Sequence, residues 1–290
     1  MILIVGCGFL GNYLLREFTE KSYEPIIATI RDMQNKSTVT SAEYIYCDVT
    51  DRASLKELAN ACKNEELTVF YLASCHNVDY VFTNPEKASY INVDCLRVFL
   101  DTVPNIKKLF YASTDCVYGD NKNILFSEKD KLSPVNEYGR QKIAAENIVL
   151  NRGFTVLRLP FMLGPSLSSK PHFYDNISKA ISNGEPIEMI DGMHRSVLSY
   201  HQVARLIFSL SLLPYDTLPK IINICGDDAI SKYDIGLAVA DKSGISSDTV
   251  KPIPEKDGAK FFKDNRASFT AMDNTLLKTI LKLKEIKWEV

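Results

Sequence analysis

The chain has 290 residues, of which 46% are apolar and 24% charged, and its 34 basic and 36 acidic residues leave a net charge of −2. This composition supports a sizeable core and excludes extensive disorder. The balanced charge gives no electrostatic reason to expect a nucleic-acid or membrane partner, and no apolar stretch approaches the ~20 residues that span a bilayer.

The cysteines and histidines indicate neither a metal site nor a disulfide scaffold. The seven cysteines are scattered without a C-x-x-C motif, and the four histidines are not spaced like metal ligands. The first eleven residues, MILIVGCGFLG, lack the positive leader and the cleavage site of a signal peptide. We therefore expect a cytoplasmic protein with reduced thiols and no metal.

In the first 160 residues, short apolar runs rich in β-branched and aromatic residues alternate with helix-like stretches. The runs span 2–5, 25–30, 44–47, 68–73, 108–113 and 154–159, and the helical stretches span 10–20, 52–63, 85–103 and 134–151. Such alternation is typical of a parallel sheet with helices on both faces. We predict an α/β fold, a Rossmann-type doubly wound parallel sheet, with a dinucleotide-binding core at 1–160 that includes the catalytic residues.

After residue 160 the pattern loosens. We expect loops at 164–171 and 182–195, helices near 172–183, 200–213, 231–243 and 273–284, and a strand at 221–224. This predicts a smaller C-terminal lobe at 161–290 that binds mainly substrate, with 196–226 returning to the core.

The segment Gly6-Cys7-Gly8-Phe9-Leu10-Gly11 is a G-x-G-x-x-G motif between the first strand and the first helix. Its glycines permit a tight turn and a close approach of backbone N–H groups to a pyrophosphate, and the helix N-terminus favours the same anion. This context predicts a dinucleotide site.

The second strand ends in Arg31-Asp32, which bears on the choice of cofactor. An acidic residue here would accept from ribose hydroxyls and favour NAD, whereas an arginine would pair with the 2′-phosphate of NADP. Because Arg31 falls where the strand should emerge, we expect NADP(H) in preference to NAD(H). Asp48, after the third strand, is placed to reach the adenine edge.

The sequence EYGRQK places Tyr138 and Lys142 on one face of a helix, one turn apart. Upstream, Thr114 ends the fifth strand, at the sheet edge where open α/β folds bind ligands. The three residues are candidates for a single site.

Taken together, GCGFLG, STDCVYG and Y-x-x-x-K resemble the extended short-chain dehydrogenases/reductases, the NAD-dependent epimerase/dehydratase family that acts on nucleotide sugars. Further matching segments are YLAS at 71–74, SYINVD around Asn92, RLPFMLGP at 158–165, HRSVLSYHQVA at 194–204 and INICG at 222–226. The resemblance implies a set of cofactor-binding residues: Gly6, Gly8, Phe9, Leu10, Gly11, Arg31, Asp48, Val49, Leu72, Ala73, Ser74, Asn92, Tyr138, Lys142 and Pro160.

In such a site Tyr138 would transfer a proton to or from the substrate oxygen, and Thr114 would hydrogen-bond that oxygen. Lys142 and an oxidised nicotinamide, both cationic, would lower the pKa of the tyrosine toward neutrality. A shift of ~3 units requires about 4 kcal/mol of differential stabilisation.

The residues after Thr114 discriminate within the family. Nucleotide-sugar 4,6-dehydratases resemble Thr-Asp-Glu here, but this chain has Cys116, which cannot act as a carboxylate base, so we exclude a dehydratase. STD followed by an apolar residue resembles the dTDP-4-dehydrorhamnose reductases, whereas DGMHRSVLSYHQVA is closer to the epimerases. We expect a reductase of a nucleotide-linked 4-keto sugar, with an epimerase that recycles NAD and a non-catalytic NAD(P)-sensing protein as alternatives.

The resemblance also assigns residues to the substrate. Arg195 would bind the nucleotide diphosphate and Arg266 would add a second contact, while His76, with its neighbour Asn77, and Asp115 would lie on the substrate side. The helices near 85–103 and 134–151 form a dimer interface in many members, which implies a homodimer.

Overall fold

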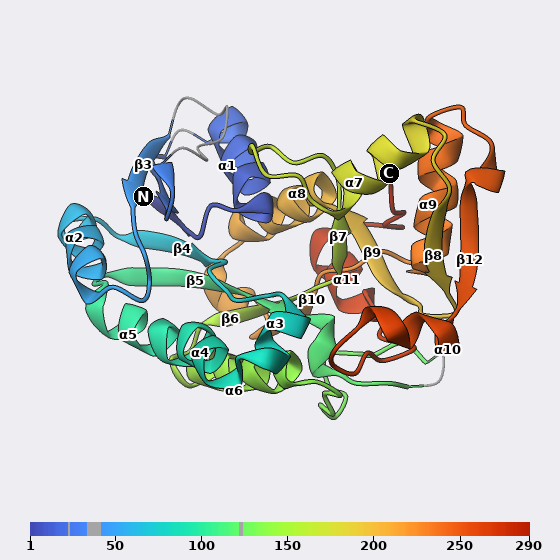
Figure 1. Cartoon of the computed structure of the whole chain (residues 1–290). Helices are drawn as coiled ribbons and strands as arrows, with labels where there is room; N and C mark the ends of the chain where they lie inside the picture. Colours follow the sequence, from blue (N-terminus) through green and yellow to red (C-terminus); the bar gives the residue numbers. More distant parts are fainter. Residues whose placement is uncertain (23, 34–41, 122–123) are drawn as a thin grey trace.

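The apolar runs form one sheet in the computed structural model, which describes residues 1–22, 24–33, 42–121 and 124–290 (Figure 1). Its seven strands have the order β10-β6-β5-β4-β1-β2-β3, and all neighbouring pairs are parallel. The strands are β1 (Ile2–Val5), β2 (Ile26–Ile30), β3 (Glu43–Tyr46), β4 (Leu67–Tyr71), β5 (Ile106–Thr114), β6 (Thr155–Leu159) and β10 (Ile221–Asn223). The Rossmann-type sheet is thereby confirmed.

Helices cover both faces of this sheet, which explains why β1, β2 and β6 are buried along their whole length. One face carries α1 (Phe9–Lys21), α8 (Tyr200–Ser211) and α11 (Thr275–Leu281), and the other carries α2 (Arg52–Cys62), α5 (Cys95–Thr102) and α6 (Glu137–Asn151). The strand order reverses at β1, between β2 and β4. Such a switch point opens a crevice at the carboxyl ends of the strands, where ligands bind.

The helix expected over 85–103 is interrupted. The chain instead forms α3 (Val78–Thr83), α4 (Pro85–Ser89), a π-helical turn at Tyr90–Asp94 and then α5. The turn contains the buried Asn92, whose side chain hydrogen-bonds the backbone of Cys75 outside the helix. A π-turn of this kind commonly marks a functional region.

The second lobe contains more strands than expected. β7 (Phe161–Leu163), β9 (Arg195–Ser199) and β11 (Ala229–Ile230) form a three-stranded sheet, and β8 (Ile187–Asp191) pairs in parallel with β12 (Val250–Pro254). The predicted loop at 182–195 therefore contains β8, whose partner lies far along the chain. The remaining elements are α7 (Phe173–Ser182), α9 (Lys232–Lys242), α10 (Glu255–Gly258) and 3₁₀ turns at Asp115–Val117, Tyr215–Thr217, Ser247–Thr249 and Ala259–Phe261.

Among the described residues, no helix has both the length and the apolar character required to cross a membrane.

Close packing brings α6 against the end of β5. A β-carbon on Gly139, the third residue of α6, would lie 2.4 Å from the carbonyl oxygen of Cys116 and 2.7 Å from the β-carbon of Pro134. A glycine at this position therefore lets the helix that carries Tyr138 and Lys142 approach Thr114.

We predict that Gly139→Ala lowers the free energy of unfolding by about 1–3 kcal/mol, because the methyl group has no room. Glycine to alanine inside a helix normally stabilises by roughly 0.5–1 kcal/mol, so the sign is diagnostic. Urea unfolding measures the effect. Gly236→Ala in α9 is the comparison and should cost less, since its closest neighbours are the side chains of Met189 at 2.4 Å and Val250 at 2.7 Å rather than a backbone carbonyl. A Gly139→Ala variant as stable as the wild type would contradict this packing argument.

Candidate active site

A cavity of about 970 Å³ lies at the carboxyl edge of the sheet, between the core and the second lobe. The glycine loop, the ends of β2, β4 and β5, α6, β9 and α9 all contribute residues to its lining. Of the residues expected from the sequence, the lining includes Gly6, Gly8, Phe9, Leu10, Gly11, Arg31, Val49, Leu72, Ala73, Ser74, His76, Thr114, Tyr138, Lys142, Pro160, Arg195 and Arg266. Asp48, Asn77, Asn92 and Asp115 are not part of it.

The glycine loop fits a dinucleotide pyrophosphate. Gly6 has a φ of +91°, and a β-carbon there would lie 2.7 Å from the backbone nitrogen of Ala73. Gly8 precedes α1 and has no atom within 4 Å of its β-carbon position, so a side chain would enter the open space above the helix. The backbone at the N-terminus of α1 is therefore accessible to an anion.

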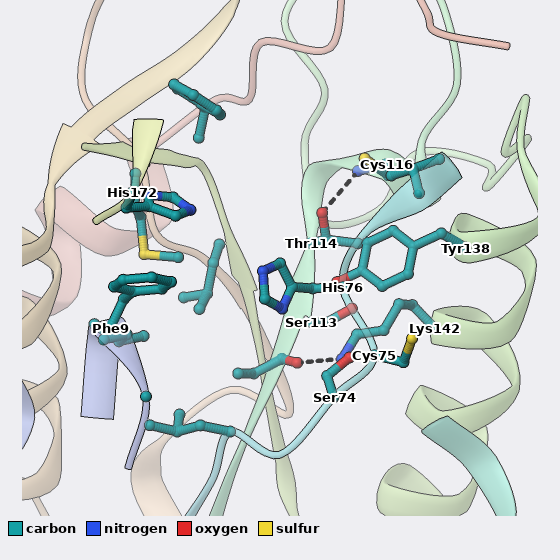
Figure 2. A pocket seen from close by; sticks show the side chains of 18 of the residues that line it. Phe9, Ser74, Cys75, His76, Ser113, Thr114, Cys116, Tyr138, Lys142 and His172 are labelled. Atoms are coloured by element: carbon teal, nitrogen blue, oxygen red, sulfur yellow. Dashed lines mark hydrogen bonds between the residues drawn. The ribbon is translucent and has the colours of Figure 1, made fainter. Parts of the chain in front are cut away.

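A contact between the rings of Phe9 and His172, which the sequence did not suggest, lines this end of the cavity (Figure 2). The ring centres lie 4.1 Å apart with the planes tilted by 41°, and His172 Nδ1 is 3.2 Å from the hydroxyl of Tyr200. Burial lowers the pKa of His172, and His76 across the cavity lowers it further. The loop before α7 thus covers the glycine loop with a neutral imidazole at neutral pH.

Asp48 and Asn92, two residues predicted to contact the cofactor, lie outside the cavity lining and form hydrogen bonds within its walls. The Asp48 carboxylate accepts from the backbone N–H of Thr50 at 2.9 Å and from its hydroxyl at 2.8 Å, which fixes the turn after β3. Asn92 accepts from the backbone N–H of Cys75 at 2.7 Å and donates to Gln141 of α6 at 2.9 Å. Asn92 therefore links the segment after β4 to α6, outside the cavity lining.

The structure brings Thr114, Tyr138 and Lys142 together on one side of the cavity (Figure 2). Tyr138 is only 8% exposed and packs with Cys75 and Cys116. Lys142 is 1% exposed; its ammonium donates to the carbonyl of Ala112 at 2.5 Å and lies 4.2 Å from the centre of the Tyr111 ring.

The pKa values of the pair shift in opposite directions. Burial raises the pKa of Tyr138 well above its usual value; Cys116 and Asp115 add to this, while Ser74 and Arg195 oppose it. Burial lowers the pKa of Lys142 to about 7, against the attraction of Glu146 one turn later. The described groups around Tyr138 therefore keep the phenol protonated, and the expected downward shift of its pKa requires further positive charge beside the ring.

A buried network lies behind the pair. Glu146 and Arg158 are each 2% exposed and form an ion pair through Arg158 Nη2 at 2.8 Å and Nε at 3.1 Å. Ser113, which precedes Thr114, donates to the same carboxylate. The network ties β5, β6 and α6 together beneath the cavity.

The residues predicted to contact the substrate form hydrogen bonds and ion pairs within the protein. Asp115 is fully buried and accepts from Arg195 Nε at 2.9 Å and Nη2 at 2.5 Å. Arg266 Nη2 donates to Asp79 at 2.9 Å. Asn77 caps α3 through the backbone N–H of Tyr80 at 2.9 Å. Among the expected substrate residues only His76, Arg195 and Arg266 thus reach the cavity.

These features can be compared with known proteins. A model of the family described as RmlD substrate binding domain matches residues 1–290, the whole chain. The chain belongs to this family. The RmlD-family chain has the extended short-chain dehydrogenase/reductase fold predicted from its motifs.

Among curated proteins, the RmlD-family chain is similar to methionine adenosyltransferase 2 subunit beta of Xenopus tropicalis, with 26% identity over 88% of this chain and 75% of that protein. Among solved structures, it is similar to a hypothetical dTDP-4-dehydrorhamnose reductase from Sulfolobus tokodaii (TM-score 0.80, 22% identity, 99% and 97% of the two chains). It is also similar to UDP-glucuronic acid 4-epimerase from Bacillus cereus in complex with UDP-glucuronic acid and NAD (TM-score 0.80, 19% identity, 100% and 95%).

The buried Lys142 gives a testable pH dependence. Its pKa of about 7 in the folded protein is below its ordinary value of 10.5, so between these limits the unfolded chain binds more protons. Relative to Lys142→Met, the wild type should therefore gain unfolding free energy as pH rises from 7 to 10, by at most about 1.4 kcal/mol per unit.

Urea unfolding at pH 7, 8 and 9 measures this difference. The exposed Lys56→Met in α2 is the control and should show no such slope. A pH-independent difference between wild type and Lys142→Met would mean that Lys142 keeps an ordinary pKa in the fold.

Proposed function

We propose that the protein is an NAD(P)-dependent reductase of a nucleotide-linked 4-keto sugar, similar to the dTDP-4-dehydrorhamnose reductases. One observation carries the proposal: Thr114, Tyr138 and Lys142 line the same cavity as the glycine loop. Residues 1–160 would bind the cofactor and catalyse, and 161–290 would mainly hold the sugar nucleotide.

The chain's residues can supply the proton chemistry. A bound reduced nicotinamide would supply the hydride for the carbonyl carbon. Tyr138, held neutral by burial, donates its proton to the carbonyl oxygen, so that the ketone gains a hydride and a proton and becomes an alcohol. The hydroxyl of Thr114, which donates to Asp115 at 3.0 Å in the structure, would turn its proton to that oxygen and position it, and a protonated Lys142 would stabilise the phenolate left behind.

An epimerase is the second candidate. The chain is structurally similar to a UDP-glucuronic acid 4-epimerase in complex with NAD, and one tyrosine can accept and return the same proton. A non-catalytic role is the third candidate, because curated relatives are named as a subunit of methionine adenosyltransferase 2. The presence of Tyr138 and Lys142 in the cavity favours turnover.

The assembly and the location are also proposals. Tyr90 of the π-turn, within the predicted helical stretch 85–103, is an exposed aromatic residue, which supports a homodimer through the helices near 85–103 and 134–151. All seven cysteines are free thiols, which supports a cytoplasmic location.

The deciding experiment follows nicotinamide absorbance with NADPH or NADH and a dTDP-4-keto-6-deoxy sugar. Stoichiometric loss of reduced cofactor supports the reductase. A change of sugar configuration without cofactor loss supports the epimerase, and no change with any 4-keto nucleotide sugar supports the non-catalytic role.

We predict that Tyr138→Phe lowers kcat by roughly 10²–10⁴-fold, the usual contribution of a positioned proton donor, without changing the dinucleotide Kd. Absorbance assays and fluorescence titration measure the two quantities. A Tyr138→Phe variant with nearly wild-type kcat would refute the assignment of Tyr138 as the proton donor.

We predict that Arg31→Ala weakens NADPH binding by about tenfold or more and NADH binding much less, because only NADPH has a 2′-phosphate for a charge-assisted hydrogen bond. Titration with both cofactors measures this. Asp32→Ala is the matched variant and should weaken NADH more than NADPH. Equal losses for both cofactors in Arg31→Ala would rule out the preference for NADP.

A further inference from the structure

Lys232 lies at the substrate end of the cavity, although no sequence motif pointed to it. It is the first residue of α9, and the hydroxyl of Ser231 caps that helix by accepting from Asp234 N–H at 3.1 Å. Its ammonium lies 5.6 Å from the ring centre of Phe173 and 5.2 Å from that of Phe262. These aromatic walls direct the lysine into the cavity, whose lining includes it.

The neighbouring arginines already have protein partners. Arg195 directs Nε and Nη2 at Asp115, and Arg266 directs Nη2 at Asp79 and Nη1 at the backbone oxygen of Asp264 at 3.0 Å. In the part of the chain that the structure describes, Lys232 forms no ion pair or hydrogen bond; its contacts are with the two rings. Of the three cations, Lys232 is therefore the one whose charged group has no described protein acceptor, whereas each arginine already uses part of its guanidinium on an aspartate.

The charges around Lys232 favour an anion. Three cations, Arg195, Lys232 and Arg266, face two carboxylates, Asp115 and Asp79, which leaves one positive charge in excess. Burial, together with Arg195 and Arg266, lowers the pKa of Lys232 to about 8, and Asp79 opposes this shift. An unpaired cation in a partly desolvated site is costly, and an incoming anion removes that cost.

We propose that Lys232 binds the diphosphate of a nucleoside-diphosphate sugar, while Arg195 and Arg266 remain paired with their aspartates and shape the wall. The ligand class rests on the proposed function. The role of Lys232 rests on its ammonium, which lines the cavity and has no described protein acceptor. A lysine ammonium on a flexible stem suits a phosphate oxygen as a point charge.

The test is calorimetric titration of the dinucleotide-saturated protein with UDP, dTDP and uridine. Lys232→Met should weaken binding of the diphosphates by about tenfold or more, as expected for a lost charge-assisted hydrogen bond, while uridine binding and the dinucleotide Kd stay unchanged. Lys232→Arg should restore most of the affinity. Lys242→Met, at the exposed end of the same helix, is the matched control and should bind like the wild type.

The pH dependence of UDP binding distinguishes a direct charge contact from a merely structural role of Lys232, because only the charge contact depends on the protonation of the lysine. Above pH 8 free Lys232 loses its proton, so the wild-type affinity for UDP should fall by up to tenfold per pH unit. Lys232→Arg should not show this fall, because arginine stays charged.

The outcomes separate the two proposals. If the wild type binds UDP or dTDP but Lys232→Met binds them equally well, the role of Lys232 is refuted and the proposed function stands. If the wild type binds neither nucleotide while it binds the dinucleotide, the nucleotide-sugar substrate itself is refuted, and the ligand proposed for Lys232 with it.

Discussion

The ion pair between Asp115 and Arg195 joins the two halves of the molecule. Asp115 follows Thr114 at the end of β5, and Arg195 begins β9 in the second lobe, 80 residues later. Asp115 also accepts from the hydroxyls of Thr114 at 3.0 Å and Thr270 at 3.1 Å. With the two nitrogens of Arg195, four donor atoms therefore bind this fully buried carboxylate. Because a buried charge that loses its partner costs about 3–5 kcal/mol, this pair holds the lobe at a fixed distance from Thr114. The same pairing neutralises Arg195 and leaves the excess charge at Lys232.

The catalytic side depends on a second constraint, the burial of Lys142. Close packing at Gly139 brings α6 to β5, and Glu146, paired with Arg158, lies one turn beyond the lysine. In that environment Tyr138 stays a neutral phenol at neutral pH, while Lys142, with a pKa of about 7, can be charged or neutral. A ligand that brings hydroxyl acceptors to Lys142 would favour its charged form, and a positive charge near Tyr138 would lower the pKa of the phenol. Under the proposed function, cofactor binding would in this way prepare Tyr138 for proton transfer.

The sequence predicted the parts of the molecule that depend on local pattern. Continuous apolar runs identify strands buried on both faces, the glycine spacing identifies the first turn, and Tyr138 and Lys142 are one helical turn apart. Contacts between distant segments were not predictable in this way. The pairing of β8 with β12, the tilted contact of Phe9 with His172 and the position of Lys232 each depend on how the second lobe folds back. Arg195 lines the cavity, but its bond to Asp115 has no signature in either segment.

The kinds of reaction that the cavity can support follow from its acids and bases. Elimination of water from a sugar requires a second acid or base beside Tyr138, and burial raises the pKa of the Cys116 thiol, which therefore stays protonated. Of the described residues that line the cavity, Asp32 alone is a carboxylate, and it follows β2, whereas Tyr138 lies on α6 beside β5. Asp115 is close enough, but its oxygens are held by Arg195 and Thr270. The residues after Thr114 therefore offer no free carboxylate, and a Tyr138 that transfers one proton with one hydride would suit a reduction or, forward and back, an epimerisation.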